Sequence, residues 1–132
     1  MQRLALFTNI SSLTDGLLTR LLQDHVWIDD FVRQNQALMA TQYQKTADFL
    51  DSKEIEYVPA SGGFFVWINL SHLLVSHPSS ETERDLWERL IKAGVLISPA
   101  SAFGSQAYGW FRIVFTLDWD LLLLGLERVL GV

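Results

Sequence analysis

The residue with the clearest chemical potential is Arg112, in the middle of the stretch 110–115. This stretch, WFRIVF, is rich in aromatic and β-branched side chains and is typical of a β-strand. Because side chains alternate along a strand, Arg112 would share one face with Trp110 and Val114. A planar, permanently charged guanidinium on such an apolar wall needs an anion, and its donors match a carboxylate in a two-pronged bond.

Two interpretations of Arg112 follow from the strand alone. One is a structural ion pair with an Asp or Glu of this chain, because a buried charge must be paired whatever its role. The other is a binding arginine that holds the carboxylate of a small molecule. The strand pattern is compatible with both, and the elements around it must decide which anion can reach the guanidinium.

Hydrophobic spacing and capping residues predict the elements that position Arg112. Helices are expected at about 13–23, from about Asp24 to about Ser52, between Ser80 and Gly94, and after Asp118, with Asp24 and Asp118 as the caps of their helices. Strands are expected at 54–58, 64–69, 95–98 and 110–115. In the turn at 59–63, a glycine pair permits positive φ.

Three details of the expected helices can be checked directly. Ser12 and Ser80 each begin a sequence that resembles a capping box, so both are expected as N-caps. Gly94 is expected to end its helix in the left-handed conformation. The core stripe of that helix should consist of Leu86, Trp87, Leu90 and Ile91.

The order of elements predicts an α/β fold of the two-layer, α+β kind. A sheet of about four strands would carry helices on one face, preceded by a long helix. A chain of 132 residues suits a single domain, 1–132, with a helical lead-in at 1–52 and an α/β core at 53–132. The long helix would extend about 40 Å at 1.5 Å per residue, so we expect it to bridge to another body.

Composition limits the class of partner. The chain is 49% hydrophobic, with five Trp and eight Phe, and only 19% charged, which favours an apolar face that needs a partner. Its net charge of -5 argues against nucleic acid and anionic membranes as partners. The run of leucines at 121–124 is too short to span a bilayer.

Residue types also argue against metal, disulfide and secretion. Cysteine is absent, and the three histidines, His25, His72 and His77, show no ligand-like spacing, so no metal site is expected. The N-terminal stretch has a short apolar run without a small-residue cleavage site, so we do not expect a signal peptide. Two glycosylation patterns, at Asn9 and Asn69, are then chance matches. A cytoplasmic, reducing compartment is expected.

Four motifs together resemble a known family. In chain order they are YVPASGGFFVWINL, RDLWERLIKAGV, ISPASAFG and GWFRIVF. Their order and spacing resemble the C-terminal part of class I/II aminotransferases, PLP enzymes of fold type I, and most closely the 1-aminocyclopropane-1-carboxylate (ACC) synthase-like members. The resemblance runs from about Ser11 to the C-terminus, and it implies the fold of the small domain of these enzymes.

The resemblance also implies roles for individual residues. The arginine of the strand motif, Arg112, would bind the α-carboxylate of the substrate. Gly62 and Phe64 would lie in a loop that borders the substrate pocket, and Ser101 and Phe103 would lie in a loop that forms one edge of it. No catalytic residue is expected in the chain. The sequence departs from the family pattern at Asp15, where relatives often carry Gln, and at Ala100, where they often carry Gly.

The cofactor of the family would be pyridoxal 5'-phosphate, held in the intact parent enzyme. By resemblance, its Schiff-base lysine and phosphate cradle lie upstream, in a large domain that this chain lacks. The chain has only Lys45, Lys53 and Lys92, which lie in helices or at their ends. Lysine near a helix C-terminus is ordinary dipole complementation, so we expect no cofactor on this chain alone.

Two functional hypotheses remain open. The first is a substrate-recognition domain of a PLP-dependent transaminase or ACC synthase-like lyase, inactive alone. Its partners would be an amino-acid substrate, the missing large domain and further copies of itself. The second is a non-catalytic interaction module that keeps the fold and self-associates. A complete small enzyme is disfavoured because no nucleophile–base pair or carboxylate dyad stands out. The sequence leaves open which amino acid is bound and whether transamination or elimination follows.

Overall fold

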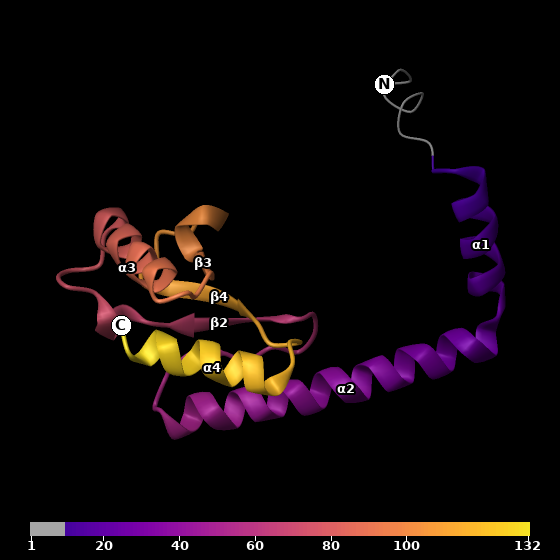
Figure 1. The fold of residues 1–132 in the computed structure, drawn as a ribbon, viewed down its shortest axis with the longest axis horizontal. Helices are drawn as coiled ribbons and strands as arrows, with labels where there is room; N and C mark the ends of the chain where they lie inside the picture. Colours follow the sequence, from indigo (N-terminus) through magenta and orange to yellow (C-terminus); the bar gives the residue numbers. More distant parts are fainter. Residues whose placement is uncertain (1–9) are drawn as a thin grey trace, which may run out of the picture. The chain divides into compact units, whose positions relative to one another are not determined.

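The computed structural model describes residues 10–132 (Figure 1). The elements are α1 (Ser12–Gln23), α2 (His25–Ser52), β1 (Tyr57–Val58), β2 (Phe65–Asn69), the 3-10 helix η2 (Ser71–Leu73), α3 (Ser80–Lys92), β3 (Ser98–Pro99), the 3-10 helix η3 (Ala100–Phe103), β4 (Trp110–Val114) and α4 (Trp119–Leu130). The N-terminal stretch considered as a signal peptide, and Asn9, lie in residues 1–9, outside this range. Within the described range, no helix combines the length and apolarity needed to cross a membrane.

Contacts divide the chain into two compact units, 1–38 and 39–132. The long helix α2 contributes residues to both units. The described part of the first unit consists of α1 and the N-terminal portion of α2. The second unit contains the sheet, α3, α4 and the C-terminal portion of α2, and all buried apolar residues within the described range 10–132 belong to it.

The four strands form one antiparallel sheet in the order β1-β2-β4-β3. At the centre, Trp67 on β2 pairs with Arg112 on β4, and Ser98 on β3 pairs with Arg112 from the other side. The predicted fold class, a four-stranded α+β sheet accompanied by helices, is therefore confirmed.

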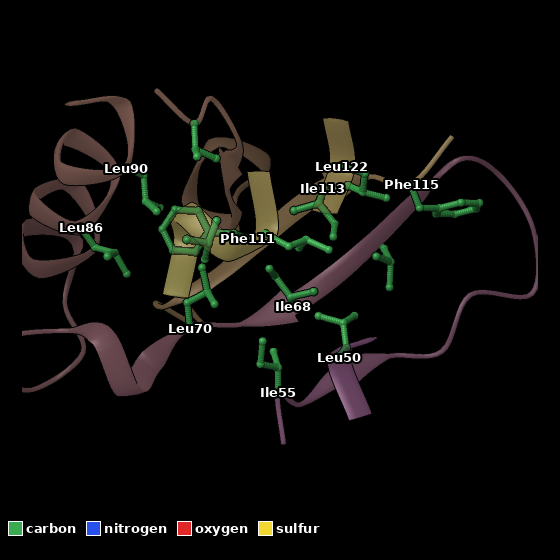
Figure 2. Packing of buried hydrophobic residues seen from close by; sticks show 14 residues of the cluster. Leu50, Ile55, Ile68, Leu70, Leu86, Leu90, Phe111, Ile113, Phe115 and Leu122 are labelled. Carbon is green, nitrogen blue, oxygen red and sulfur yellow. The ribbon is translucent and has the colours of Figure 1, made fainter. Parts of the chain in front are cut away.

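The helices of the second unit pack on one face of this sheet (Figure 2). Buried and half-buried residues alternate along β2 and β4, as a pleated strand with one covered face requires. Figure 2 shows Ile68, Phe111 and Ile113 pointing among apolar side chains of the helices. The core side chains contributed by the helices are Leu50 of α2, Leu86 and Leu90 of α3, and Leu122, Leu126 and Val129 of α4.

The opposite side of the sheet is called the open face here. Strand alternation and the observed register define its members. They are Val58, Phe65, Trp67, Asn69, Ser98, Trp110, Arg112 and Val114. None of these residues is buried, although all but Val58 are half-buried.

Two expected strands are shorter than predicted because helix ends occupy their first residues. The segment 54–58 supplies only Tyr57–Val58 to the sheet, and the N–H of Ile55 donates to the carbonyl of Leu50 at 2.9 Å. The segment 95–98 supplies Ser98–Pro99, and the N–H of Val95 donates to the carbonyl of Leu90 at 2.9 Å. Both bonds complete the C-terminal turn of a helix, so the N–H groups of Ile55 and Val95 are not available to a strand ladder.

Three capping expectations are confirmed and two are wrong by one residue. Asp24 accepts from the N–H of Trp27 at 3.0 Å, Asp118 caps α4, and Gly94 has φ 81. At α1 the N-cap is Ser11, without a side-chain capping bond, in place of Ser12. At α3 the N-cap is Ser79 in place of Ser80.

The correction at α3 has a physical reason. Ser79 and Thr82 exchange both capping bonds, since the Ser79 hydroxyl accepts from the Thr82 N–H at 3.2 Å and the Thr82 hydroxyl accepts from the Ser79 N–H at 2.9 Å. Glu83, expected to complete the box with Ser80, is thereby free to turn into the protein interior. The predicted core stripe holds at Leu86 and Leu90, but Ile91 is 41% exposed.

The end of α2 offers a test of backbone strain. Glu54 has φ 55, a left-handed conformation that costs a residue with a Cβ about 1 kcal/mol. We expect Glu54→Gly to raise the free energy of unfolding, measured in urea, by about 0.5–1 kcal/mol relative to Glu54→Ala. Both variants remove the carboxylate, so their difference isolates the backbone. Equal stability of the two variants would contradict this assignment.

Candidate functional site

Arg112 lies at the centre of the open face. Its strand buries Phe111 and Ile113 against the helices and leaves Trp110, Arg112 and Val114 half-buried on the other side. The alternation predicted from the sequence is therefore confirmed. Because β4 is an inner strand, paired on both sides at Arg112, the backbone at this position is fixed by two neighbouring strands.

Aromatic rings surround the guanidinium group. Its carbon atom lies 4.1 Å from the ring centre of Phe65 and 4.0 Å from that of Phe103. Both distances are within the range of cation–π attraction. The Phe103 ring also meets Trp67 edge to face, with ring centres 5.5 Å apart. We call Phe65, Trp67 and Phe103 the aromatic clamp, because they contact the charged group or one another without supplying a hydrogen-bond acceptor.

Within residues 10–132, Arg112 forms no ion pair. Each ion pair in this range involves another arginine, and no carboxylate oxygen lies within 4.0 Å of the Arg112 nitrogens. Arg89 gives the contrast. It donates to the carbonyl oxygens of Leu73 at 2.7 Å and Val132 at 3.1 Å, and it pairs with Asp85 at 3.2 Å. The interpretation of Arg112 as a structural ion pair therefore finds no partner in the described chain.

Two cavities lie beside the aromatic clamp. The first, of about 370 Å³, is lined on the open face by Arg112, Phe65, Ser98 and Val114. Its remaining lining comes from segment 94–97, Ile113, Leu117 and residues of α4, so it includes side chains from both faces of the sheet. The second, of about 320 Å³, is lined by open-face residues together with Phe103 and neighbours in the loop after η3. Among the described residues lining either cavity, Arg112 is the only charged one.

The other residues predicted for the site fall into two groups. Phe103 is brought against Arg112, whereas Phe64 is half exposed and reaches the site only through the ring of Phe65, 4.2 Å from its own. Gly62 and Ser101 line neither cavity. The positive φ expected in the glycine pair occurs at Gly63, with φ 78.

Sequence reasoning did not single out Phe65 or Trp67. Strand 64–69 is apolar at nearly every position, so its alternation does not reveal which face is covered by helices. The register supplies the missing information, because it places Trp67 directly opposite Arg112 and Phe65 one step along the same face. Pairing the aromatic-rich stretch 64–69 with the stretch 110–115 would have indicated that Phe65 and Trp67 lie beside Arg112.

None of the three lysines of the chain lines either cavity. The Lys45 ammonium lies 5.8 Å from the ring centre of Trp119, and that of Lys53 lies 5.8 Å from Phe49. Lys92 is exposed at the end of α3. These positions belong to helices on the covered side of the sheet, so the residues present do not fit attachment of PLP beside Arg112. In residues 10–132, no three His, Asp or Glu side chains gather closely enough for a metal ion.

Known sequences are similar to this one over most of its length. ACC synthase 6 of Oryza sativa subsp. japonica is 36% identical over 115 residues, which cover 86% of this chain and 21% of that protein. ACC synthase-like protein 1 of Takifugu rubripes is 33% identical over 128 residues, which cover 96% of this chain and 21% of that protein. The chain spans between about a fifth and a quarter of the length of these curated relatives.

Solved structures share the fold. Aspartate aminotransferase from Thermus thermophilus with maleate has a TM-score of 0.68 and 23% identity, covering 82% of this chain and 26% of that one. Aromatic aminotransferase from Pyrococcus horikoshii OT3 has a TM-score of 0.67 and 20% identity, covering 83% of this chain and 28% of that one. At such identities the likeness shows the fold and not the function.

Nearly the whole chain matches the model of one protein family. That family is described as Aminotransferase class I and II, and its match extends over residues 1–129. The sequence relatives and the structural neighbours agree with this match, and so does the α+β sheet that presents Arg112. The chain therefore belongs to the class I and II aminotransferase family.

Proposed function

We propose that this chain is the substrate-recognition part of a PLP-dependent aminotransferase or ACC synthase-like enzyme, and that Arg112 binds the α-carboxylate of an amino acid. The observation that carries the proposal is a guanidinium held by Phe65 and Phe103, beside a cavity, without an ion-pair partner in residues 10–132. Membership of the family and similarity to ACC synthases support the choice of ligand.

The aromatic clamp would favour this role in two ways. Rings against the guanidinium restrict its orientation, so less rotamer freedom is lost when a carboxylate binds. They also keep water from the charge, and a charge-assisted hydrogen bond is stronger in a less polar environment. The N–H edge of the guanidinium could then hold both carboxylate oxygens and fix the direction of the bonds at the Cα atom of the ligand.

The remaining chemistry would come from outside this chain. PLP supplies an electron sink for amino-acid chemistry when it is bound through a lysine. Because none of the chain's lysines lines the cavities beside the aromatic clamp, the cofactor and its lysine would belong to the rest of the parent protein. The isolated chain is then expected to bind amino acids weakly and to catalyse no transamination or elimination.

A second candidate function, self-association without catalysis, is favoured by the surface of the first unit. The first unit exposes large apolar side chains on α1 and on the start of α2. Examples are Leu13 at 84%, Leu17 at 59%, Leu22 at 61% and Val26 at 82% exposure. Several large apolar side chains exposed on neighbouring stretches of helix commonly mark an interaction site. This function and carboxylate binding do not exclude each other.

Carboxylate binding can be measured on the 132-residue chain by NMR titration of the Arg112 Nε–H signal with L-alanine. We expect saturable shifts with a Kd in the millimolar range, about 1 mM or weaker, because a single ion pair holds a small ligand. Arg112→Lys should raise the Kd about tenfold, since an ammonium lacks the planar fork.

Alaninamide provides the matched ligand control, because it has the same side chain and amine without a carboxylate. It should leave the Arg112 signal unchanged. Equal shifts with both ligands, or equal affinities of the wild-type chain and Arg112→Lys, would contradict the proposal.

Self-association can be tested by light scattering of the wild-type chain and of Leu17→Glu. We expect the wild type to be larger than a monomer at high concentration and the variant to shift toward the monomer, because a charge on the exposed α1 surface opposes apolar contact. Val75→Glu is the matched control, since Val75 is 70% exposed but lies in the second unit. A wild-type chain that stays monomeric would exclude this candidate.

A further inference from the structure

Glu83 is a carboxyl group with an unusual environment. It lies in the first turn of α3 but is only 1% exposed, and no other Asp or Glu in residues 10–132 is buried. Its Oε2 atom accepts the backbone N–H of Gly109 at 2.8 Å. Its Oε1 atom has no hydrogen-bond partner within the described chain.

Stability alone does not explain this arrangement. A buried carboxyl group with one unsatisfied oxygen costs free energy, and its single hydrogen bond to Gly109 offsets only part of that cost. Capping of α3 does not require Glu83 either, because Ser79 and Thr82 already exchange both capping bonds. A buried polar group that is left partly unsatisfied therefore calls for another explanation.

The group that Glu83 holds is the backbone of Gly109. This residue has φ 91, and an added Cβ atom would lie 2.5 Å from the hydroxyl of Ser71. The Gly109 carbonyl accepts the N–H of Leu70, at the end of β2, at 2.8 Å. Gly109 is thus bound through its N–H by α3 and through its carbonyl by the residue after β2, and it packs closely on Ser71.

Gly109 stands where two parts of the site meet. It immediately precedes β4, which carries Arg112 three residues later, and it ends the loop that follows η3 and Phe103. A fixed Gly109 therefore restrains the start of β4, which carries Arg112. It also restrains the end of the loop that begins after Phe103, the residue whose ring lies against the guanidinium. Leu70 anchors the same point, and it directly follows β2, the strand that supplies Phe65 and Trp67.

We infer that Glu83 is a positioning residue for Arg112: by holding the Gly109 N–H, it sets the position of the guanidinium within the aromatic clamp. The expected effect of Glu83 on ligand affinity rests on the proposed carboxylate-binding function. Its effect on the position of the guanidinium does not. Loss of the acceptor would loosen the junction of loop and strand, and the Phe103 ring would then contact the guanidinium less closely.

The test compares Glu83→Met with Glu83→Gln in the 132-residue chain. Methionine has a similar length without an acceptor, and glutamine keeps an oxygen that can accept the Gly109 N–H. Glu81→Met is the matched control, because Glu81 lies in the same turn but is exposed. The readouts are the NMR shifts of the Gly109 amide and the Arg112 side chain, the urea unfolding midpoint, and the Kd for L-alanine.

We expect Glu83→Met to fold but to unfold at a lower urea concentration than the wild type, because the buried Gly109 N–H loses its acceptor. Its Arg112 side-chain signals should lose the ring-current shifts caused by Phe65 and Phe103, and its Kd for L-alanine should rise about tenfold. Glu83→Gln should retain the wild-type shifts and affinity, as should Glu81→Met. Wild-type Arg112 signals in a folded Glu83→Met chain would overturn the inference.

Two further outcomes remain decisive. If Glu83→Met does not fold, Glu83→Asp replaces it, since the shorter side chain withdraws the acceptor from Gly109. Retained Arg112 shifts in that variant would overturn the inference, and their loss would support it. If the wild-type chain shows no Arg112 response to L-alanine, the proposed function fails, while the ring-current shifts still decide the role of Glu83.

Discussion

Within residues 10–132, the arrangement of the chain depends on a guanidinium that is held by aromatic rings and not by a carboxylate. A ring contact of this kind stabilises the charged group by about 0.5–1 kcal/mol at a partly exposed site. This is much less than the free energy lost when an unpaired charge is removed from water. The rings of Phe65 and Phe103 therefore orient Arg112 without neutralising it. An arginine held in this way remains able to bind an external anion, which is the property expected of a substrate-recognition residue.

The sheet separates stability from binding. On its covered face, Phe111 and Ile113 pack with leucines of three helices and form the core. On the other face, the intervening Arg112 contacts aromatic side chains and lines one cavity. Because consecutive side chains of one strand point to opposite faces, the core directly fixes the backbone that presents the arginine. The buried Glu83 adds a second constraint, at the glycine where this strand begins.

Much of this architecture could be predicted from local sequence signals. Asp24, Gly94 and Asp118 mark helix ends by known capping chemistry, and the strand around Arg112 follows from its composition. Local patterns failed where tertiary structure decides. The segments 54–58 and 95–98 are rich in strand-forming residues, but their first backbone groups complete helix ends. Adjacent serines offered no means to distinguish Ser79 from Ser80 as a cap.

The most direct test of the account is the free energy of unfolding of Arg112→Met compared with Arg89→Met, measured in urea. An arginine without an internal ion pair can be replaced by an unbranched apolar side chain at little cost, so the account predicts a change within about 1 kcal/mol for Arg112→Met. Arg89→Met removes bonds to two carbonyl groups and should cost about 2–3 kcal/mol. A loss of about 3–5 kcal/mol for Arg112→Met, typical of a broken buried ion pair, would contradict the account.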